Sequence, residues 1–466
     1  MVCTANCLTK IKTAAMNLII KNGIIVNEST TTNGELLIQD GIIKKIAKKL
    51  SDDIVASETI DAGGSYIFPG GIDPHVHMHL PGPAGYSSDD FYTGCRAALL
   101  GGTTTIIDFV TPVRGQSIIS ALEFRKKEAE DSLCNYMFHV SPIEFKENTE
   151  KELIQCMDLG IRSFKIYMAY KSSIGIDDAD IKRVLKIIGK RGGVVAVHCE
   201  LGDEIEKLRN QFYEQGKTEP VYHALSRPPE TEAEAVKRII QLAEETDCTL
   251  YLVHISSAES LEYISKAQKS GLKVFAETCP HYLLLDDSHY YGSFEKAAPF
   301  IVSPPLRKSS DNDALWKALV DGTLQAIGTD HCPFSYEQKA AGKNDFRKIP
   351  NGAGGVEHRL TLIFTYGVLK SRITLQQFVN HTSTMPAKIF GLFPQKGTIT
   401  EGSDADIVIW DPNISEIISA STHHQNCDLN IFEGIKTQGK ATYVIRNGEI
   451  MVKKGMIIST KKGLFL

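Results

Sequence analysis

The central part of the chain alternates short apolar runs with amphipathic stretches, a pattern typical of parallel strands joined by helical crossovers. Clear helical periods occur at residues 178–190, 230–244 and 258–269. Eight strand-like runs are found, at residues 66–68, 103–109, 136–140, 163–168, 194–199, 249–255, 273–279 and 324–330. Eight strands with intervening helices predict an α/β fold of the (β/α)8 barrel type, whose active site would lie at the carboxyl ends of the strands.

Both ends of the chain show a different pattern, with alternating strand-like runs broken by dipeptides that favour hairpin turns, namely Asn22-Gly23, Asp40-Gly41 and Asn447-Gly448. Neither end has enough strands to bury a face alone. The sequence therefore predicts one small β-sandwich built from both termini. The expected division is an N-terminal extension at 1–16, the sandwich at 17–66 and 395–455, the barrel at 67–394 and a C-terminal tail at 456–466.

The predicted strand ends carry polar side chains of matching chemistry. His75 and His77 occupy alternate positions, so in an extended chain their imidazoles converge. The other strand-end or strand residues of this kind are Lys165, His198, His254 and Asp330. Each could separately be a hydrogen-bonded core residue or a turn cap, but lysine is almost never buried without a partner. Because all six side chains would lie at the same end of one barrel, together they indicate a metal site.

Composition narrows the classes of protein. The chain has 466 residues, is 42% hydrophobic and 23% charged, and carries a net charge of -5. It has no basic patch for nucleic acid and no apolar run of the roughly 20 residues that a membrane helix needs. Its ten cysteines lack paired spacing, which favours reduced thiols in a cytoplasmic enzyme. The N-terminal 15 residues lack the apolar segment of a signal peptide.

Several motifs together resemble the dihydropyrimidinase and hydantoinase family of cyclic amidohydrolases, over about residues 17–455. They are GIDPHVHMHLP, GGTTTIID, SFKIYMAYK, HISS, SPPLR, GTDHCPF, KIPNGAGGVE and GSDADIVIWDP. The resemblance implies a distorted barrel with a β-sandwich, two zinc ions per chain and a homotetramer. It assigns His75, His77 and Asp330 to one ion and His198 and His254 to the other. Lys165 would bridge both ions as an N-carboxylated lysine.

The bridging lysine also has a physical rationale. Two divalent cations repel an ammonium, so they would lower the pKa of Lys165 and favour a neutral amine that captures carbon dioxide. The resulting carbamate has two oxygens and can join metals about 3.5–4 Å apart. A water between the metals would lose a proton near neutral pH and act as the nucleophile, with Asp330 accepting and then returning that proton.

The resemblance also implies substrate contacts. Tyr170 would donate its hydroxyl to the developing oxyanion, although it could equally be a barrel-rim residue that contacts backbone. Ser303 and Asn351 would hold the cyclic diamide through backbone groups, and ordinary turn chemistry is the alternative. The long segment at 331–355 is expected to be a functional loop. Gly82 stands where many family members have an aromatic residue, which leaves substrate size and stereochemical preference open.

Other residues near the predicted site are given no ligand role. Cys199 follows His198 on its strand, so its side chain should face away from the metals. Cys279, Cys332 and His331 are interpreted as packing or supporting residues. His79 is left unassigned.

The leading hypothesis is hydrolysis of a small cyclic amide, a 5,6-dihydropyrimidine or 5-substituted hydantoin, to an N-carbamoyl amino acid. Allantoinase and dihydroorotase are alternative enzymes. The dihydroorotase pattern has an arginine two residues past the second metal histidine, where this chain has His79. A non-catalytic tetrameric relative, like the collapsin response mediators, is a third alternative, but such proteins lose the ligands that are intact here.

Overall fold

The computed structural model describes residues 17–466, so the predicted extension at residues 1–16 lies outside the described part of the chain. Its centre is an eight-stranded parallel sheet with the order β15-β14-β13-β12-β11-β10-β9-β6. The strands are β6 (Gly71–Asp73), β9 (Thr103–Val110), β10 (Asn135–Val140), β11 (Ser163–Tyr167), β12 (Val194–His198), β13 (Thr249–Leu252), β14 (Val274–Thr278) and β15 (Ala326–Ile327). This arrangement confirms the predicted (β/α)8 barrel.

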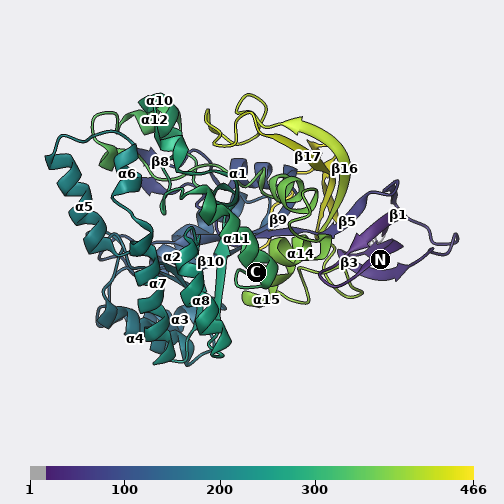
Figure 1. Cartoon of the computed structure of the whole chain (residues 1–466). Helices are drawn as coiled ribbons and strands as arrows, with labels where there is room; N and C mark the ends of the chain where they lie inside the picture. The colour runs from purple at the N-terminus through teal and green to yellow at the C-terminus, as the bar shows by residue number, and fades with distance from the viewer. Residues whose placement is uncertain (1–16) are drawn as a thin grey trace, which may run out of the picture.

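Helices cover the outside of this barrel (Figure 1). The principal ones are α1 (Phe91–Leu100), α2 (Ile118–Glu128), α3 (Thr149–Asp158), α4 (Asp178–Gly189), α7 (Pro229–Glu244), α8 (Ala258–Lys269) and α11 (Ser309–Asp321). Further helices are α5 (Gly202–Glu214), α6 (Val221–Leu225), α9 (Pro280–Leu284), α10 (Phe294–Ala297), α12 (Tyr336–Ala340), α13 (Arg359–Ile363), α14 (Leu375–Val379) and α15 (Met385–Ile389). The three helices predicted from periodicity are confirmed as α4, α7 and α8. Their periodicity arises because one face of each helix is apolar and packs against the strands.

Both ends of the chain contribute to one nine-stranded, largely antiparallel sheet, which projects away from the barrel in Figure 1. Its strands are β1 (Asn17–Val26), β2 (Thr31–Gln39), β3 (Ile42–Ala47), β4 (Glu58–Asp61), β5 (Tyr66–Pro69), β16 (Ile407–Ile417), β17 (Lys436–Arg446), β18 (Glu449–Lys453) and β19 (Met456–Ile457). The sheet encloses an apolar core of its own, drawn from both terminal segments. The predicted sandwich is thus one continuous hydrogen-bonded sheet.

Two details of the terminal prediction are wrong. The run at 66–68 is not the first barrel strand, because β5 pairs with β1 and β16 and the barrel begins at β6. The chain crosses between the sheets at Gly70, where a Cβ atom would lie 2.2 Å from Oγ1 of Thr104. Asn22-Gly23 is a bulge inside β1 and not a hairpin turn. This bulge lets β1 pair first with β4 and then with β5.

The last residues of the chain lie against the barrel. The backbone N–H of Tyr136 in β10 donates to the carbonyl of Leu464 at 2.9 Å, and the N–H of Leu466 donates back to the carbonyl of Tyr136 at 3.0 Å. Leu466 packs against the cluster that contains Ile389 and Phe390. The C-terminal segment therefore extends along the start of β10.

Side chains, rather than a continuous ladder, close the barrel between its edge strands β6 and β15. The buried Arg359 donates from Nη1 to the carbonyls of Ile72 at 2.8 Å and Ile327 at 2.9 Å. Thr329 donates from its backbone N and Oγ1 to the Asp73 carboxylate at 3.1 and 2.7 Å. These bonds hold the segments after β6 and β15 side by side, where His77 N donates to His331 O at 2.8 Å.

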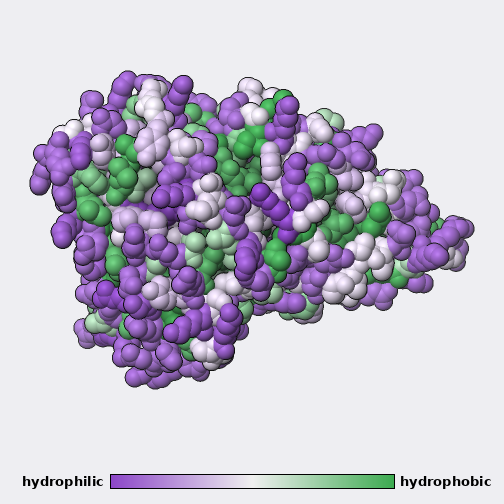
Figure 2. Space-filling view, in the orientation of Figure 1, coloured by the Kyte–Doolittle hydropathy of each residue, from purple (hydrophilic) through white to green (hydrophobic). Residues whose placement is uncertain are grey.

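Within residues 17–466, no helix combines the length and apolar character required to cross a membrane. On the face drawn in Figure 2, apolar residues form small separate groups between hydrophilic ones.

We expect Arg359→Met to destabilise the protein by about 3 kcal/mol, because the carbonyls of Ile72 and Ile327 would lose buried donors. Urea unfolding followed by circular dichroism measures the change. Arg191→Met removes an exposed ion pair with Asp158 and is the control, with an expected loss below about 1 kcal/mol. Equal midpoints for the two variants would contradict the closing role of Arg359.

Candidate metal centre

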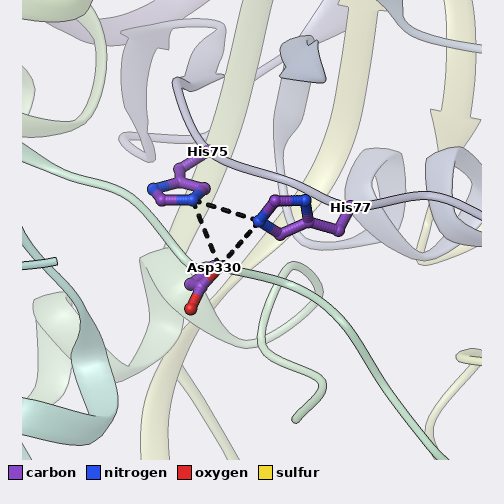
Figure 3. Close-up of side chains that lie close together, drawn as sticks. All are labelled: His75, His77 and Asp330. Carbon is purple, nitrogen blue, oxygen red and sulfur yellow. Dashed lines mark hydrogen bonds and ion pairs between the residues drawn. The ribbon is translucent and has the colours of Figure 1, made fainter. Parts of the chain in front are cut away.

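Three of the predicted ligands meet at the barrel seam, the junction where β6 and β15 close the barrel. Figure 3 shows the rings of His75 and His77 and the carboxylate of Asp330 directed at one another. Nε2 of His75 lies 3.2 Å from Nε2 of His77 and 3.2 Å from Oδ1 of Asp330. Nε2 of His77 lies 3.1 Å from the same oxygen. The set comes from the segment after β6 and the segment after β15, which the seam holds together.

The donor chemistry of this cluster fits a divalent cation. Burial lowers the pKa of His75 well below its usual range, so its imidazole is neutral at neutral pH. Its Nδ1 contacts the Glu277 carboxylate, which leaves the Nε2 lone pair facing Asp330. Burial alone would raise the pKa of Asp330, but the neighbouring His75 and His77 outweigh burial and keep it below the usual value. Lone pairs directed at one point are stabilised by a cation.

A second pair of histidines lies next to the first cluster. Nδ1 of His198 is 2.9 Å from Nε2 of His254, and the His254 ring centroid is 5.4 Å from that of His75. Nε2 of His198 contacts Glu200 at 2.7 Å, so Nδ1 is the nitrogen free to bind a metal. Burial lowers the pKa values of both histidines, which keeps them in the neutral, ligating form.

Lys165 is buried close enough to both groups of donors to influence their protonation. Its side chain is 1% exposed on β11, and its charge acts on His75, His198 and His254. Burial lowers the pKa of Lys165 to about 8, while the Asp330 and Glu277 carboxylates limit that decrease. A sizeable fraction of the amine is therefore neutral near physiological pH.

Backbone strain is concentrated at this site. Tyr170, His254 and Asp330 have φ values of 59°, 43° and 51°, in the left-handed region that non-glycine residues rarely adopt. Such strain persists only where the surrounding structure imposes it, and it is frequent at functional sites. All three residues are among those singled out from the sequence.

The predicted substrate residues lie on loops around the same centre. The Tyr170 ring is 5.3 Å from that of His198. Asn351 is half-buried and precedes Gly352 and Ala353, the latter paired with His331 next to Asp330. Gly352 N donates to Ile301 O at 2.9 Å, which brings the loop that contains the half-buried Ser303 alongside. The segment at 331–355 is thus ordered by its contacts with the barrel mouth.

The neighbouring residues without a predicted ligand role have other partners. His331 contacts Asp89 through Nε2 at 3.1 Å and accepts from Gly355 N through Nδ1 at 3.1 Å. Cys199 and Cys279 belong to the outer core between strands and helices. Cys332 is buried beside Gly352. His79 stacks on Tyr86 with ring centroids 3.9 Å apart.

Two supporting glutamates were missed from the sequence. Glu277 contacts His75 and accepts from the Tyr251 hydroxyl at 2.7 Å. Burial raises the pKa of Glu277 to about 8, and a cation bound by His75 would favour its ionised form. Glu200 joins His198 to Arg227 at 2.5 Å, which holds the ring in one tautomer. The sequence offered one signal for each residue. Glu277 is a carboxylate within the strand-like run at 273–279, and Glu200 lies two positions after His198.

Fold and site together define a (β/α)8-barrel metalloprotein whose donors gather at the carboxyl ends of its strands. Residues 66–451 match the amidohydrolase family. The D-hydantoinase of Geobacillus stearothermophilus is 45% identical over 94% of this chain and 93% of its own length. The dihydropyrimidinase of Dictyostelium discoideum is 41% identical over 93% of this chain and 87% of its own length. A crystal structure of D-hydantoinase superposes with a TM-score of 0.94, at 44% identity, over 97% of this chain and 98% of the other.

The chain belongs to the amidohydrolase family and is a hydrolase. The resemblance drawn from its motifs is confirmed, and the family together with the cluster of His75, His77 and Asp330 implies a divalent metal.

Replacing Glu277 by Gln should weaken metal binding about 10- to 100-fold, because the carboxylate that orients His75 and raises its basicity is lost. Chelator competition at equilibrium measures the affinity. Glu245→Gln alters an exposed ion pair with Lys182 and serves as the matched control. An unchanged affinity in Glu277→Gln would show that His75 is oriented by other contacts.

Proposed function

We propose that this protein hydrolyses the ring amide of 5,6-dihydropyrimidines or 5-substituted hydantoins and releases N-carbamoyl amino acids. The observation that carries this proposal is the pair of neighbouring donor clusters at the barrel mouth, together with the buried Lys165. Relatives named D-hydantoinase and dihydropyrimidinase, matched over nearly the whole chain, support the substrate class.

We further propose how the donors are divided. His75, His77 and Asp330 would hold one zinc ion, and His198 and His254 a second. Lys165 would join the two ions after its neutral amine has combined with carbon dioxide, since a carbamate is an anion with two oxygens. Metal ions held by these residues would supply Lewis-acid polarisation and would lower the pKa of bound water. The pKa of about 8 for Lys165 supports this chemistry, because the neutral amine is the reactive form.

The remaining residues would bind and transfer protons. The carboxylate of Asp330 would accept a proton at the metal centre and return it to the departing ring nitrogen, which is a poor leaving group unless protonated. Tyr170, on its strained backbone beside His198, would donate its hydroxyl to the carbonyl oxygen as negative charge develops there. Backbone groups at Ser303 and Asn351 would hold the two amide units of the ring.

Assembly, location and domain limits are part of the same proposal. The resemblance supports a homotetramer, and the unpaired spacing of the cysteines supports a cytoplasmic location. The expected limits of 17–66 and 395–455 for the sandwich, 67–394 for the barrel and 456–466 for the tail shift slightly in this proposal, because β5 (Tyr66–Pro69) and β19 (Met456–Ile457) pair within the terminal sheet.

The test is a comparison of initial rates with dihydrouracil, hydantoin, phenylhydantoin and allantoin. We expect turnover of the first three to exceed that of allantoin. Absence of ring opening with dihydrouracil and both hydantoins would refute the proposed function.

Asp330→Asn should lower kcat at least ~10²-fold, with a smaller change in KM, because the amide cannot accept the proton. Near wild-type kcat in Asp330→Asn at full metal occupancy would refute its proton transfer.

For Lys165→Ala, we expect loss of metal and of nearly all activity, because the two donor clusters would no longer be joined. Short carboxylic acids should restore part of both, since they can replace the carbamate oxygens. Metal content per chain, measured after gel filtration, is the primary readout. Lys171→Ala, which removes an exposed partner of Asp203 near the barrel rim, is the control. Wild-type metal content in Lys165→Ala would contradict the bridging role.

A further inference from the structure

Helix α12 makes contacts that the proposed reaction does not use. We propose that Gln338 and Lys339, neighbours on this helix, are positioning residues that fix three substrate loops in one geometry. The inference rests on the proposed function for the identity of the substrate. Lys339 fixes the two loops proposed to hold the ring, and Gln338 fixes the hairpin of β7 (Pro81–Gly82) and β8 (Gly85–Tyr86) at the rim.

Lys339 joins the loops that contain Ser303 and Asn351. Its side chain is 1% exposed, and Nζ donates to Ile301 O at 3.0 Å, Pro350 O at 2.7 Å and Gly352 O at 2.8 Å. Three carbonyl acceptors match the three N–H donors of an ammonium and favour that charged form, whereas burial lowers the pKa of Lys339 to about 7. Two of these carbonyls flank Asn351, and the third lies two residues before Ser303. The positions of both proposed ring contacts therefore depend on one buried side chain.

Gln338 joins the same helix to the rim hairpin. Its Nε2 donates to Ala84 O at 3.1 Å and Tyr86 O at 2.7 Å. Its Oε1 accepts from Ser335 N at 2.9 Å and completes the capping box at the start of α12. One amide thus stabilises the helix through its oxygen and the hairpin through its nitrogen. Figure 1 shows β8 and α12 in the same region of the barrel mouth.

These loops reach the metal centre through short hydrogen-bonded connections. Ala353 pairs with His331, whose carbonyl accepts from His77 N. At the base of the hairpin, Ser87 Oγ donates to His77 O at 3.0 Å. A displacement of either loop therefore changes its distance from the metal ligands, and an error of about 1 Å in such positioning can cost 10²-fold in rate.

The contacts of Lys339 with the inner loops and of Gln338 with the hairpin should affect different parts of the substrate. Ser303 and Asn351 are half-buried, whereas most of the hairpin is exposed, including Tyr86 at 51%. Under the proposed function, the inner loops would face the ring itself, and the exposed hairpin would meet a substituent that projects from the ring towards solvent. Lys339 is therefore a determinant of ring binding for every substrate, and Gln338 a determinant of selectivity between substituents.

Two substitutions separate these roles. Lys339→Met keeps the length of the side chain and removes its three donors. Gln338→Glu keeps the cap oxygen and places a carboxylate against the carbonyls of Ala84 and Tyr86. Glu337→Gln, an exposed change on the same helix, and Lys343→Met, which removes an exposed ion pair with Glu295, are the matched controls.

Kinetics are measured with hydantoin and phenylhydantoin on metal-loaded enzyme. We expect Lys339→Met to raise KM about 10-fold or more for both substrates with unchanged metal content. Gln338→Glu should change the ratio of kcat/KM between the substrates about 5-fold or more and leave hydantoin turnover close to wild type. Both controls should match the wild type. Kinetics of either test variant that equal those of its control would overturn its assigned role.

Amide hydrogen exchange provides a readout that does not depend on activity. Faster exchange should be confined to residues 301–303 and 350–353 in Lys339→Met and to residues 80–87 in Gln338→Glu. If Lys339→Met does not fold, Lys339→Gln, which retains two N–H donors, replaces it with the same expected pattern. Unchanged exchange in these segments would overturn the positioning role. If the wild-type enzyme opens neither the hydantoins nor dihydrouracil while exchange in the variants changes as expected, the proposed function is refuted and the loop contacts stand.

Discussion

The structure depends on closing a parallel barrel whose first and last strands do not form a continuous ladder. Arg359 replaces the missing ladder by donating to carbonyls on both edge strands, and Asp73 accepts from Thr329 beyond the end of β15. Burial lowers the pKa of Arg359, and Asp73 opposes that decrease without a close ion pair, since the two charged groups are 3.9 Å apart. Carbonyl dipoles therefore stabilise much of the guanidinium charge. Because this seam joins the segments after β6 and β15, it also brings His75 and His77 to Asp330.

The metal centre is a consequence of that closure. Its assembly is energetically costly because it buries polar and charged groups close together. Buried imidazole nitrogens and a carboxylate face one another at hydrogen-bond distances, and Lys165 is buried among them. Carboxylates behind the histidines, Glu277 and Glu200, select the nitrogen that faces inward. Left-handed backbone at His254 and Asp330 adds a local cost of order 1–3 kcal/mol for each residue. The protein meets these costs through its extensive apolar cores, and the result is a set of donors already arranged for a cation.

The connections above the barrel extend this arrangement outward. The segment after β15 returns past Asp330 through α12 to the loop with Asn351, and each part contacts the barrel mouth. Amidohydrolase membership fixes the general chemistry, whereas under the proposed function the loop geometry would select the ring and its substituent. Gln338 binds two carbonyls of the hairpin that contains Gly82. Selectivity can therefore change without alteration of the metal centre.

The sequence by itself determined the barrel, the helices α4, α7 and α8, and the set of metal-binding residue types at strand ends, because apolar periodicity and alternation are local properties of the chain. It also indicated the family through motifs distributed along most of the chain. It could not place β5 in the terminal sheet, since a short apolar run is compatible with either sheet. The choice becomes visible only in the folded chain, which crosses between the sheets at Gly70 beside Thr104. Nor could the sequence reveal Arg359, Glu277 or Lys339, whose partners are distant in sequence. Only the tertiary structure decided those roles, because a buried polar group acquires its function from the groups that the fold brings to it.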